Sequence, residues 1–199
     1  MTQQATTATT LAGALWPSEK ANALLRNTIL ALAGTALLTL SAKIQVPFWP
    51  VPMTMQTFAV LVIGMAYGWR LGAATVLLYL AEGAAGLPVF SGTPEKGIGL
   101  AYMMGSTGGY LLGFVLMAGV CGWLAERGWD RSVLATGAAM LIGEVAMYIP
   151  GLLWLGALFG WDKPILEWGL TPFILGDLTK LALAAVLLPL AWSLVRRFR

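Results

Sequence analysis

Long apolar stretches separated by short polar turns dominate the pattern of hydrophobic and polar positions along this 199-residue chain. About 20 apolar residues in a helix cross the hydrocarbon core of a bilayer, and the chain has room for six such helices. The stretches lie at residues 27–46, 54–69, 71–90, 106–125, 132–160 and 168–195. The pattern therefore predicts an all-α integral membrane protein with six transmembrane helices in one compact bundle.

Two of these stretches and the N-terminal residues differ from a plain membrane span. The second stretch is short, and the fifth carries Pro150-Gly151 in its middle, which predicts a kink or a break there. Residues before Pro17 have neither a basic segment nor a long apolar core, so they do not resemble a cleaved signal peptide. We expect residues 1–22 to form a disordered or amphipathic tail and residues 23–199 to form the transmembrane domain.

The composition excludes several classes of protein. Hydrophobic residues make up 58% of the chain and charged residues 11%, whereas soluble domains are about 25% charged. There is no histidine, and the single cysteine, Cys121, lies in an apolar run where a thiol most often serves packing. Metal clusters, disulfides and Ser-His or Cys-His catalysis therefore lack their residues, and we expect no cofactor and no metal.

The basic residues are distributed unevenly between the two sides that six spans would create. Both termini and the turns near Arg70 and Glu126 fall on one side, with eight basic residues against three in or beside the opposite loops. The eight are Lys20, Arg26, Arg70, Arg127, Arg131, Arg196, Arg197 and Arg199. The positive-inside rule makes this side cytoplasmic. The net charge of +3 is thus mainly a topology signal, and no nucleic-acid partner is expected.

Five ionisable residues lie inside or at the edge of the apolar stretches, where burial of a charge costs about 2.5 kcal/mol or more. At about 1.5 Å per residue from the nearest basic anchor, they lie roughly 18 to 28 Å from the cytoplasmic side, in the outer half of a core about 30 Å thick. They are Lys43, Glu82, Glu144, Asp177 and Lys180. The inner halves of the spans carry no charge, so the pattern predicts an outward-facing cup that captures a solute.

Asp177 and Lys180 are one helical turn apart, where they can pair with each other and also present donors and acceptors to a ligand. The alternative is a structural ion pair that only neutralises itself. Pro172 and Gly176 indicate that a helix begins here, with N-terminal amides facing the cup.

Amphipathic side chains in the same outer layer could stack on a small ring and donate hydrogen bonds. Each of them alone is better explained as packing or as an interfacial anchor, but as a set they predict a pocket around the ionisable groups. The candidate binding residues are Asp177, Lys180, Tyr110, Trp49, Gln56, Tyr102, Glu144, Tyr148 and Glu82.

Four segments in order along the chain, QVPFWPVPMTMQTFAVLVIG, GAAGLPVFSG, GSTGGYLLGF and PFILGDLTK, resemble the BioY family. Members of that family are the biotin-specific substrate-capture subunits (S-components) of energy-coupling-factor (ECF) transporters. The similarity runs from about Ile44 to Lys180. It places the family's GD-x-x-K element on Gly176, Asp177 and Lys180, its proline-rich first loop on residues 47–53 and its TGGY turn on residues 107–110. The family often has proline where this chain has Ser106, which puts the rigidity of that turn in question.

The resemblance implies a six-helix protein of the bacterial cytoplasmic (inner) membrane that binds biotin from outside. Asp177 would accept hydrogen bonds from the ureido group, Lys180 would meet the carbonyl or the carboxylate, and the aromatic side chains would cover the ring. The implied partners are biotin, the lipid bilayer, an ECF transmembrane coupling subunit and two ATP-binding subunits. Some family members act without a dedicated module, and the sequence leaves open whether the protein forms a homo-oligomer.

The first apolar stretch carries small residues four positions apart, Ala31, Thr35 and Thr39, which would let another helix approach closely. The family is understood to dock its coupling subunit through small residues of this helix, so we assign these residues to partner contact as a hypothesis. Packing within the bundle explains them equally well.

The leading hypothesis is therefore a transport subunit and not an enzyme. Three alternatives stay open: a secondary transporter, a capture protein for another small vitamin, and an intramembrane enzyme that uses carboxylates such as Glu82, Glu144 and Asp177.

Overall fold

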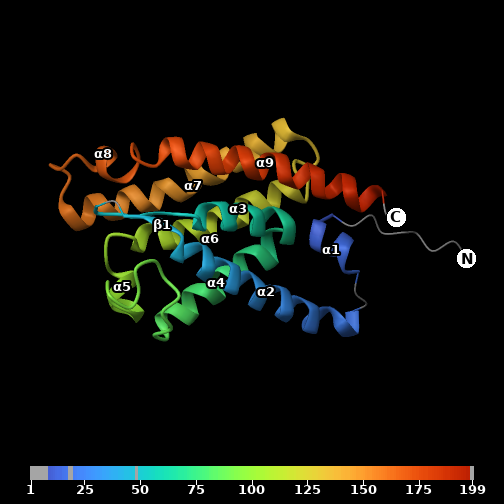
Figure 1. Cartoon of the computed structure of the whole chain (residues 1–199), viewed down its shortest axis with the longest axis horizontal. Helices are drawn as coiled ribbons and strands as arrows, with labels where there is room; N and C mark the ends of the chain where they lie inside the picture. The colour runs from blue at the N-terminus through green and yellow to red at the C-terminus, as the bar shows by residue number, and fades with distance from the viewer. Residues whose placement is uncertain (1–8, 18–19, 48, 198–199) are drawn as a thin grey trace, which may run out of the picture.

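The computed structural model describes residues 9–17, 20–47 and 49–197, and these residues form an all-helical bundle with one short hairpin (Figure 1). The long helices are α2 (Lys20–Lys43), α3 (Gln56–Tyr67), α4 (Trp69–Ala84), α6 (Gly108–Ala125), α7 (Val133–Phe159) and α9 (Ile174–Arg197). The short elements are α1 (Leu11–Leu15), α5 (Gly99–Met103), α8 (Ile165–Gly169) and the antiparallel strands β1 (Gln45–Val46) and β2 (Met53–Thr54). Each long helix lies within or close to one of the six apolar stretches, which confirms the all-α prediction.

The long helices differ in length. Among the described residues, α2, α6, α7 and α9 are long and apolar enough to cross a membrane. The 12 residues of α3 and the 16 residues of α4 rise only about 18 and 24 Å at 1.5 Å per residue. Helix α3 ends where Gly68 takes a φ of +82°, and α4 begins at the next residue.

The two ends of the bundle are built differently. The hairpin, α5 and α8 gather at one end, and α1 lies at the other end near the C-terminal part of α9 (Figure 1). Helix α1 falls within the segment expected to be a tail, yet its Leu11 and Ala14 are buried. This part of the segment is therefore packed against the bundle, whereas residues 1–8 lie outside the described residues.

Helix α7 runs without interruption from Val133 to Phe159 with Pro150 inside it, so the helix does not break at Pro150-Gly151.

Helices α6 and α7 pack closely against each other. A Cβ added to Gly113 of α6 would lie 2.5 Å from the Met147 carbonyl oxygen, and one added to Gly143 would lie 2.3 Å from Cys121 Sγ. Small residues let two helices approach this closely, and Cys121 is fully buried in the interface, as its packing role predicts.

Helix α2 turns the middle of its small-residue row inward. Thr35 is only 3% exposed, while Ala31 and Thr39 are half-buried. The same face buries Leu38 and Ala42 completely. Thr35 therefore packs within the bundle in this structure, and its assignment to partner contact is corrected.

Candidate binding site

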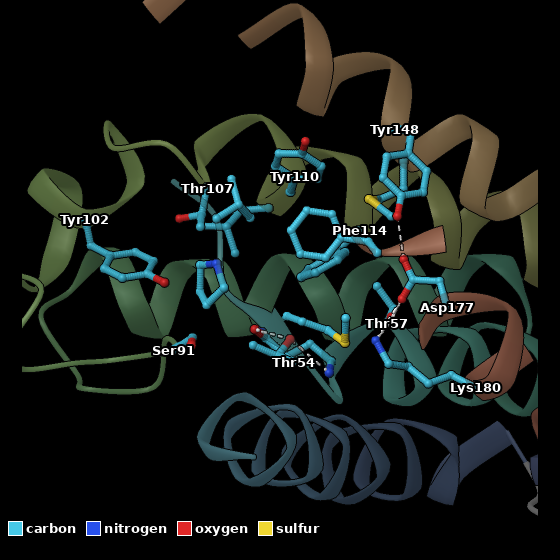
Figure 2. A pocket seen from close by; sticks show the side chains of 17 residues that line it. Thr54, Thr57, Ser91, Tyr102, Thr107, Tyr110, Phe114, Tyr148, Asp177 and Lys180 are labelled. Atoms are coloured by element: carbon cyan, nitrogen blue, oxygen red, sulfur yellow. Dashed lines mark hydrogen bonds and ion pairs between the residues drawn. The ribbon is translucent and has the colours of Figure 1, made fainter. Parts of the chain in front are cut away.

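A cavity lies beneath the hairpin, between α3, α6, α7 and α9, with about 510 Å³ of empty space including its open mouth. Its lining is mostly apolar with a few polar groups (Figure 2). The lining residues are Val51, Pro52, Met53, Thr54, Gln56, Thr57, Ser91, Tyr102, Thr107, Tyr110, Leu111, Phe114, Met147, Tyr148, Phe173, Asp177 and Lys180.

Asp177 stands in the first turn of α9, which begins at Ile174 as the positions of Pro172 and Gly176 predict. Three donors hold its buried carboxylate. Lys180 Nζ lies 2.7 Å and Thr57 Oγ1 3.0 Å from Oδ1, and the Tyr148 hydroxyl donates to Oδ2 at 2.5 Å. A carboxylate can accept about four hydrogen bonds, so room for one further donor is left beside the cavity.

Lys180 complements this arrangement. Its ammonium group donates to Asp177 and, at 3.0 Å, to Thr57 Oγ1. An ammonium group has three donors, and the residues that the structure describes supply no third acceptor. Because Lys180 is 7% exposed and lines the cavity, the pair offers a ligand one donor and one acceptor side by side.

The other predicted residues in the wall have their own partners. Gln56 Nε2 donates to the Tyr79 hydroxyl at 2.9 Å, and Tyr79 donates onward to the Val89 carbonyl. The Tyr110 hydroxyl donates to the Gly169 carbonyl at 2.7 Å. These bonds keep the Gln56 and Tyr110 side chains in place.

Tyr102 lies at the opposite end of the cavity from Asp177 and Lys180 (Figure 2). It stacks on Phe90, with ring centroids 4.9 Å apart and an interplanar angle of 17°. Burial raises the pKa of this phenol above its usual range, while its hydrogen bond to Thr107 lowers it by a smaller amount. The ring is therefore a neutral, mostly apolar wall.

Three of the predicted residues are not in the wall. Trp49 is 69% exposed and makes edge contacts with Phe159 and Trp168, at ring centroid distances of 5.9 and 5.0 Å. Glu82 is half-buried near the end of α4 and does not line the cavity. Glu144 is buried one turn before Tyr148 on α7, also outside the wall.

Lys43, the fifth ionisable residue predicted for the outer layer, anchors a loop. Its ammonium group donates to the carbonyls of Pro88, Phe90 and Thr93 and to the Thr93 hydroxyl, at 2.7 to 3.2 Å. Because all its donors have partners, Lys43 ties the end of α2 to the loop that carries Ser91 into the cavity wall.

The first loop forms part of the cavity wall through residues 51–54. The Ser106 hydroxyl donates to the Pro50 carbonyl at 2.6 Å, and Trp154 Nε1 donates to the Gly105 carbonyl at 2.8 Å. The turn that lacks the common proline is therefore held by two side-chain hydrogen bonds, one of which connects it to the loop.

Sequence reasoning missed several wall residues. Thr57 bridges Asp177 and Lys180, and a polar residue directly after Gln56 in a short apolar stretch was the signal that could have revealed it. Phe114, Met147 and Phe173 gave no such signal, because an apolar residue in a membrane span fits a lipid-facing position equally well. Among the described residues no group of three metal-ligating side chains comes together.

Comparison with known proteins agrees with this architecture. The model of the BioY family matches residues 6–197. The biotin transporter BioY of Thermotoga maritima is 38% identical over 164 residues, covering 82% of this chain and 94% of that protein. The biotin transporter BioY of Rhizobium etli is 37% identical over 167 residues, covering 80% and 88%.

A solved structure is similar in fold. It is the crystal structure of the S-component for biotin from an ECF-type ABC transporter, with a TM-score of 0.72 and 25% identity. The match covers 92% of this chain and 95% of that one. With the family model matching almost the whole sequence, this chain belongs to the BioY family.

Proposed function

We propose that the protein binds biotin with high affinity and takes it up across the cytoplasmic membrane, as the substrate-capture subunit of an ECF-type transporter. The observation that carries the proposal is the Asp177–Lys180 pair in the wall of an apolar cavity, with one acceptor and one donor position available for a ligand. The family membership and the names of the relatives support the choice of biotin.

The ureido group of biotin complements the pair. One edge of it carries an N–H donor next to a carbonyl acceptor, which matches the spare acceptor of Asp177 and the spare donor of Lys180. The apolar bicyclic ring suits Phe114 and the tyrosine rings of the wall. Hydrogen bonds to charged groups contribute about 1.5 to 3 kcal/mol each, so this edge contributes strongly to specificity.

The membrane arrangement is part of the proposal. The six long helices all cross the bilayer, with α3 and α4 as short spans, and both termini face the cytoplasm as the basic residues indicate. The hairpin, α5 and α8 then lie on the outer side, above the cavity.

The partners we propose are a transmembrane coupling subunit and two ATP-binding subunits. The half-buried Ala31 and Thr39 of α2 remain candidates for the docking face, whereas the buried Thr35 is not. Ala31→Trp should leave biotin binding intact and abolish co-purification with a coupling subunit, and a surviving complex would place the docking face elsewhere.

Equilibrium binding to the purified protein tests the function. Isothermal titration calorimetry should show saturable binding of biotin to the detergent-solubilised protein, and competition with other small vitamins should leave biotin strongly preferred. A secondary transporter would instead move biotin into vesicles without any partner, and an enzyme would convert it. No binding of biotin would reject the proposal.

A further inference from the structure

Glu144 is a buried acid that the proposed binding contacts do not use. Its side chain projects from the middle of α7, and the residue is 4% exposed. Oε1 is completely enclosed, and within residues 9–17, 20–47 and 49–197 it has no hydrogen-bond partner. Buried polar atoms nearly always have one, so this oxygen requires an explanation.

The titratable groups facing Glu144 come from three helices. Cys121 faces it from α6, Tyr148 from one turn further along α7, and Asp177 and Lys180 from α9. Lys180 donates to Asp177 and Thr57 and not to Glu144. The cluster thus holds two carboxyl groups and one ammonium group.

The charges of this cluster balance only when one carboxyl group carries a proton. Asp177 accepts three hydrogen bonds, including one from the ammonium group of Lys180. Glu144 lacks such support, and an isolated buried carboxylate neutralises itself by taking up a proton. The geometry therefore assigns the proton to Glu144.

We propose that Glu144 is a proton-binding group of the biotin site, so that biotin binds to the form in which Glu144 is protonated. The inference rests on the proposed function. When Glu144 loses its proton, it competes with Asp177 for Lys180 and adds a negative charge beside a cavity that must admit a ligand with a carboxylate. Both effects weaken binding, and neither requires Glu144 to touch biotin.

The test is the pH dependence of biotin affinity, measured by calorimetry from pH 5.5 to pH 9 on the wild type and on Glu144→Gln. In the wild type, linkage to one proton lowers the affinity by up to about tenfold per pH unit over part of this range. Glu144→Gln keeps the shape of the side chain without the ionisation. We expect it to bind as the wild type does at acidic pH and to retain that affinity as the pH rises.

Glu167→Gln is the matched control, since Glu167 is an exposed acid of α8 outside the cavity wall. It should follow the wild-type curve. A wild-type affinity that does not change with pH, or a Glu144→Gln curve that falls like the wild-type one, would overturn the inference while leaving biotin binding established. Absence of biotin binding at every pH would reject the proposed function itself.

A second measurement uses the wild type alone and so does not depend on folding of the variant. Calorimetry in two buffers of different ionisation enthalpy, at one pH in the falling part of the curve, counts the protons exchanged. We expect uptake that approaches one proton per biotin bound. Zero uptake would overturn the inference whatever the variant does.

Discussion

Two buried aspartates lie at opposite ends of α9, and their comparison shows how a binding residue differs from a structural one. Asp177 lies in the first turn of the helix and is 4% exposed. Asp130, in the turn between α6 and α7, is fully buried and accepts a hydrogen bond from Trp192 near the end of the same helix. Both are paired with a cation, yet only Asp177 lines the cavity.

Asp130, Arg131 and Trp192 contact one another. Arg131 Nε lies 2.9 Å from Asp130 Oδ1, and the Arg131 guanidinium covers the Trp192 ring at 3.5 Å from its centroid. Burial raises the pKa of Asp130, although its bonds to Trp192 and Arg131 lower it in part. This cluster fastens the α6–α7 turn to α9 and does not line the cavity.

The difference shows that burial of a charge does not by itself mark a site. The Asp177–Lys180 pair differs from the Asp130–Arg131 pair in adjoining an empty cavity, so that its remaining donor and acceptor positions are available to a ligand. Variants of the two pairs should therefore separate binding from stability.

The largest expected effect is on biotin binding at the Asp177–Lys180 pair. Asp177→Ala and Lys180→Ala each remove a charged hydrogen-bond partner, which costs about 1.5 to 3 kcal/mol. That corresponds to a roughly 10- to 150-fold weaker affinity, since every 1.4 kcal/mol is a factor of ten. Calorimetric titration with biotin measures it, and thermal unfolding checks that the bundle survives.

The exposed pair Asp162–Lys163 is a matched control, because it is also an Asp–Lys ion pair but lies outside the cavity wall. Asp162→Asn should leave the affinity unchanged. If Asp177→Ala and Lys180→Ala both bound biotin as tightly as the wild type, the Asp177–Lys180 pair would be structural, like the Asp130–Arg131 pair.

An intermediate effect on stability is expected at the Asp130–Arg131 pair. Asp130→Ala leaves the buried Trp192 N–H without its acceptor, and such a loss costs about 1 to 3 kcal/mol of unfolding free energy. Because burial raises the pKa of Asp130, the folded state holds the proton more tightly than the unfolded chain. The stabilisation that comes from this tighter proton binding is fully present below the ordinary carboxyl pKa, about 3.9, and is lost as the pH rises above it.

The difference in stability between wild type and Asp130→Ala should therefore be larger in acid than at neutral pH, measured by denaturant or thermal unfolding at both. Biotin affinity should stay within about twofold of the wild type, since Asp130 does not adjoin the cavity. Loss of binding at unchanged stability would show that the two ends are coupled.

The long helices were predictable because a membrane allows few alternatives to an apolar helix. Expected stretches such as 106–125 and 132–160 differ from α6 and α7 by at most two residues at either end. The helices α5 and α8 have only five residues each, too few for a periodic pattern to distinguish them from loop. They therefore could not be predicted from the sequence.

The site was predictable only in its polar part. Asp177, Lys180 and Tyr148 stood out because polar side chains in apolar spans need a reason. Trp49 looked equally suitable, but the direction of an aromatic side chain in a loop depends on tertiary contacts, and it packs on Phe159 and Trp168 instead. Asp130 lies between charged residues of a turn, so its sequence context indicated solvent and concealed its burial.

The smallest expected effect concerns the first loop, which the Ser106 hydroxyl connects to the TGGY turn. Ser106→Ala removes the hydrogen bond to the Pro50 carbonyl, a neutral bond that contributes about 0.5 to 1.5 kcal/mol. If this bond keeps the loop closed, the variant opens it about 2- to 12-fold more often, because 1.4 kcal/mol is a factor of ten. Thiol labelling of Val51→Cys reports the opening, since Val51 is 6% exposed and lines the cavity while Cys121 is fully buried. Ser193→Ala removes a similar bond near the C-terminal end of α9 and should leave the labelling rate unchanged.

Biotin should slow labelling of the Val51→Cys reporter, because a closed loop covers the occupied cavity. Equal labelling rates with and without biotin, and with and without Ser106→Ala, would mean that the first loop is not a lid.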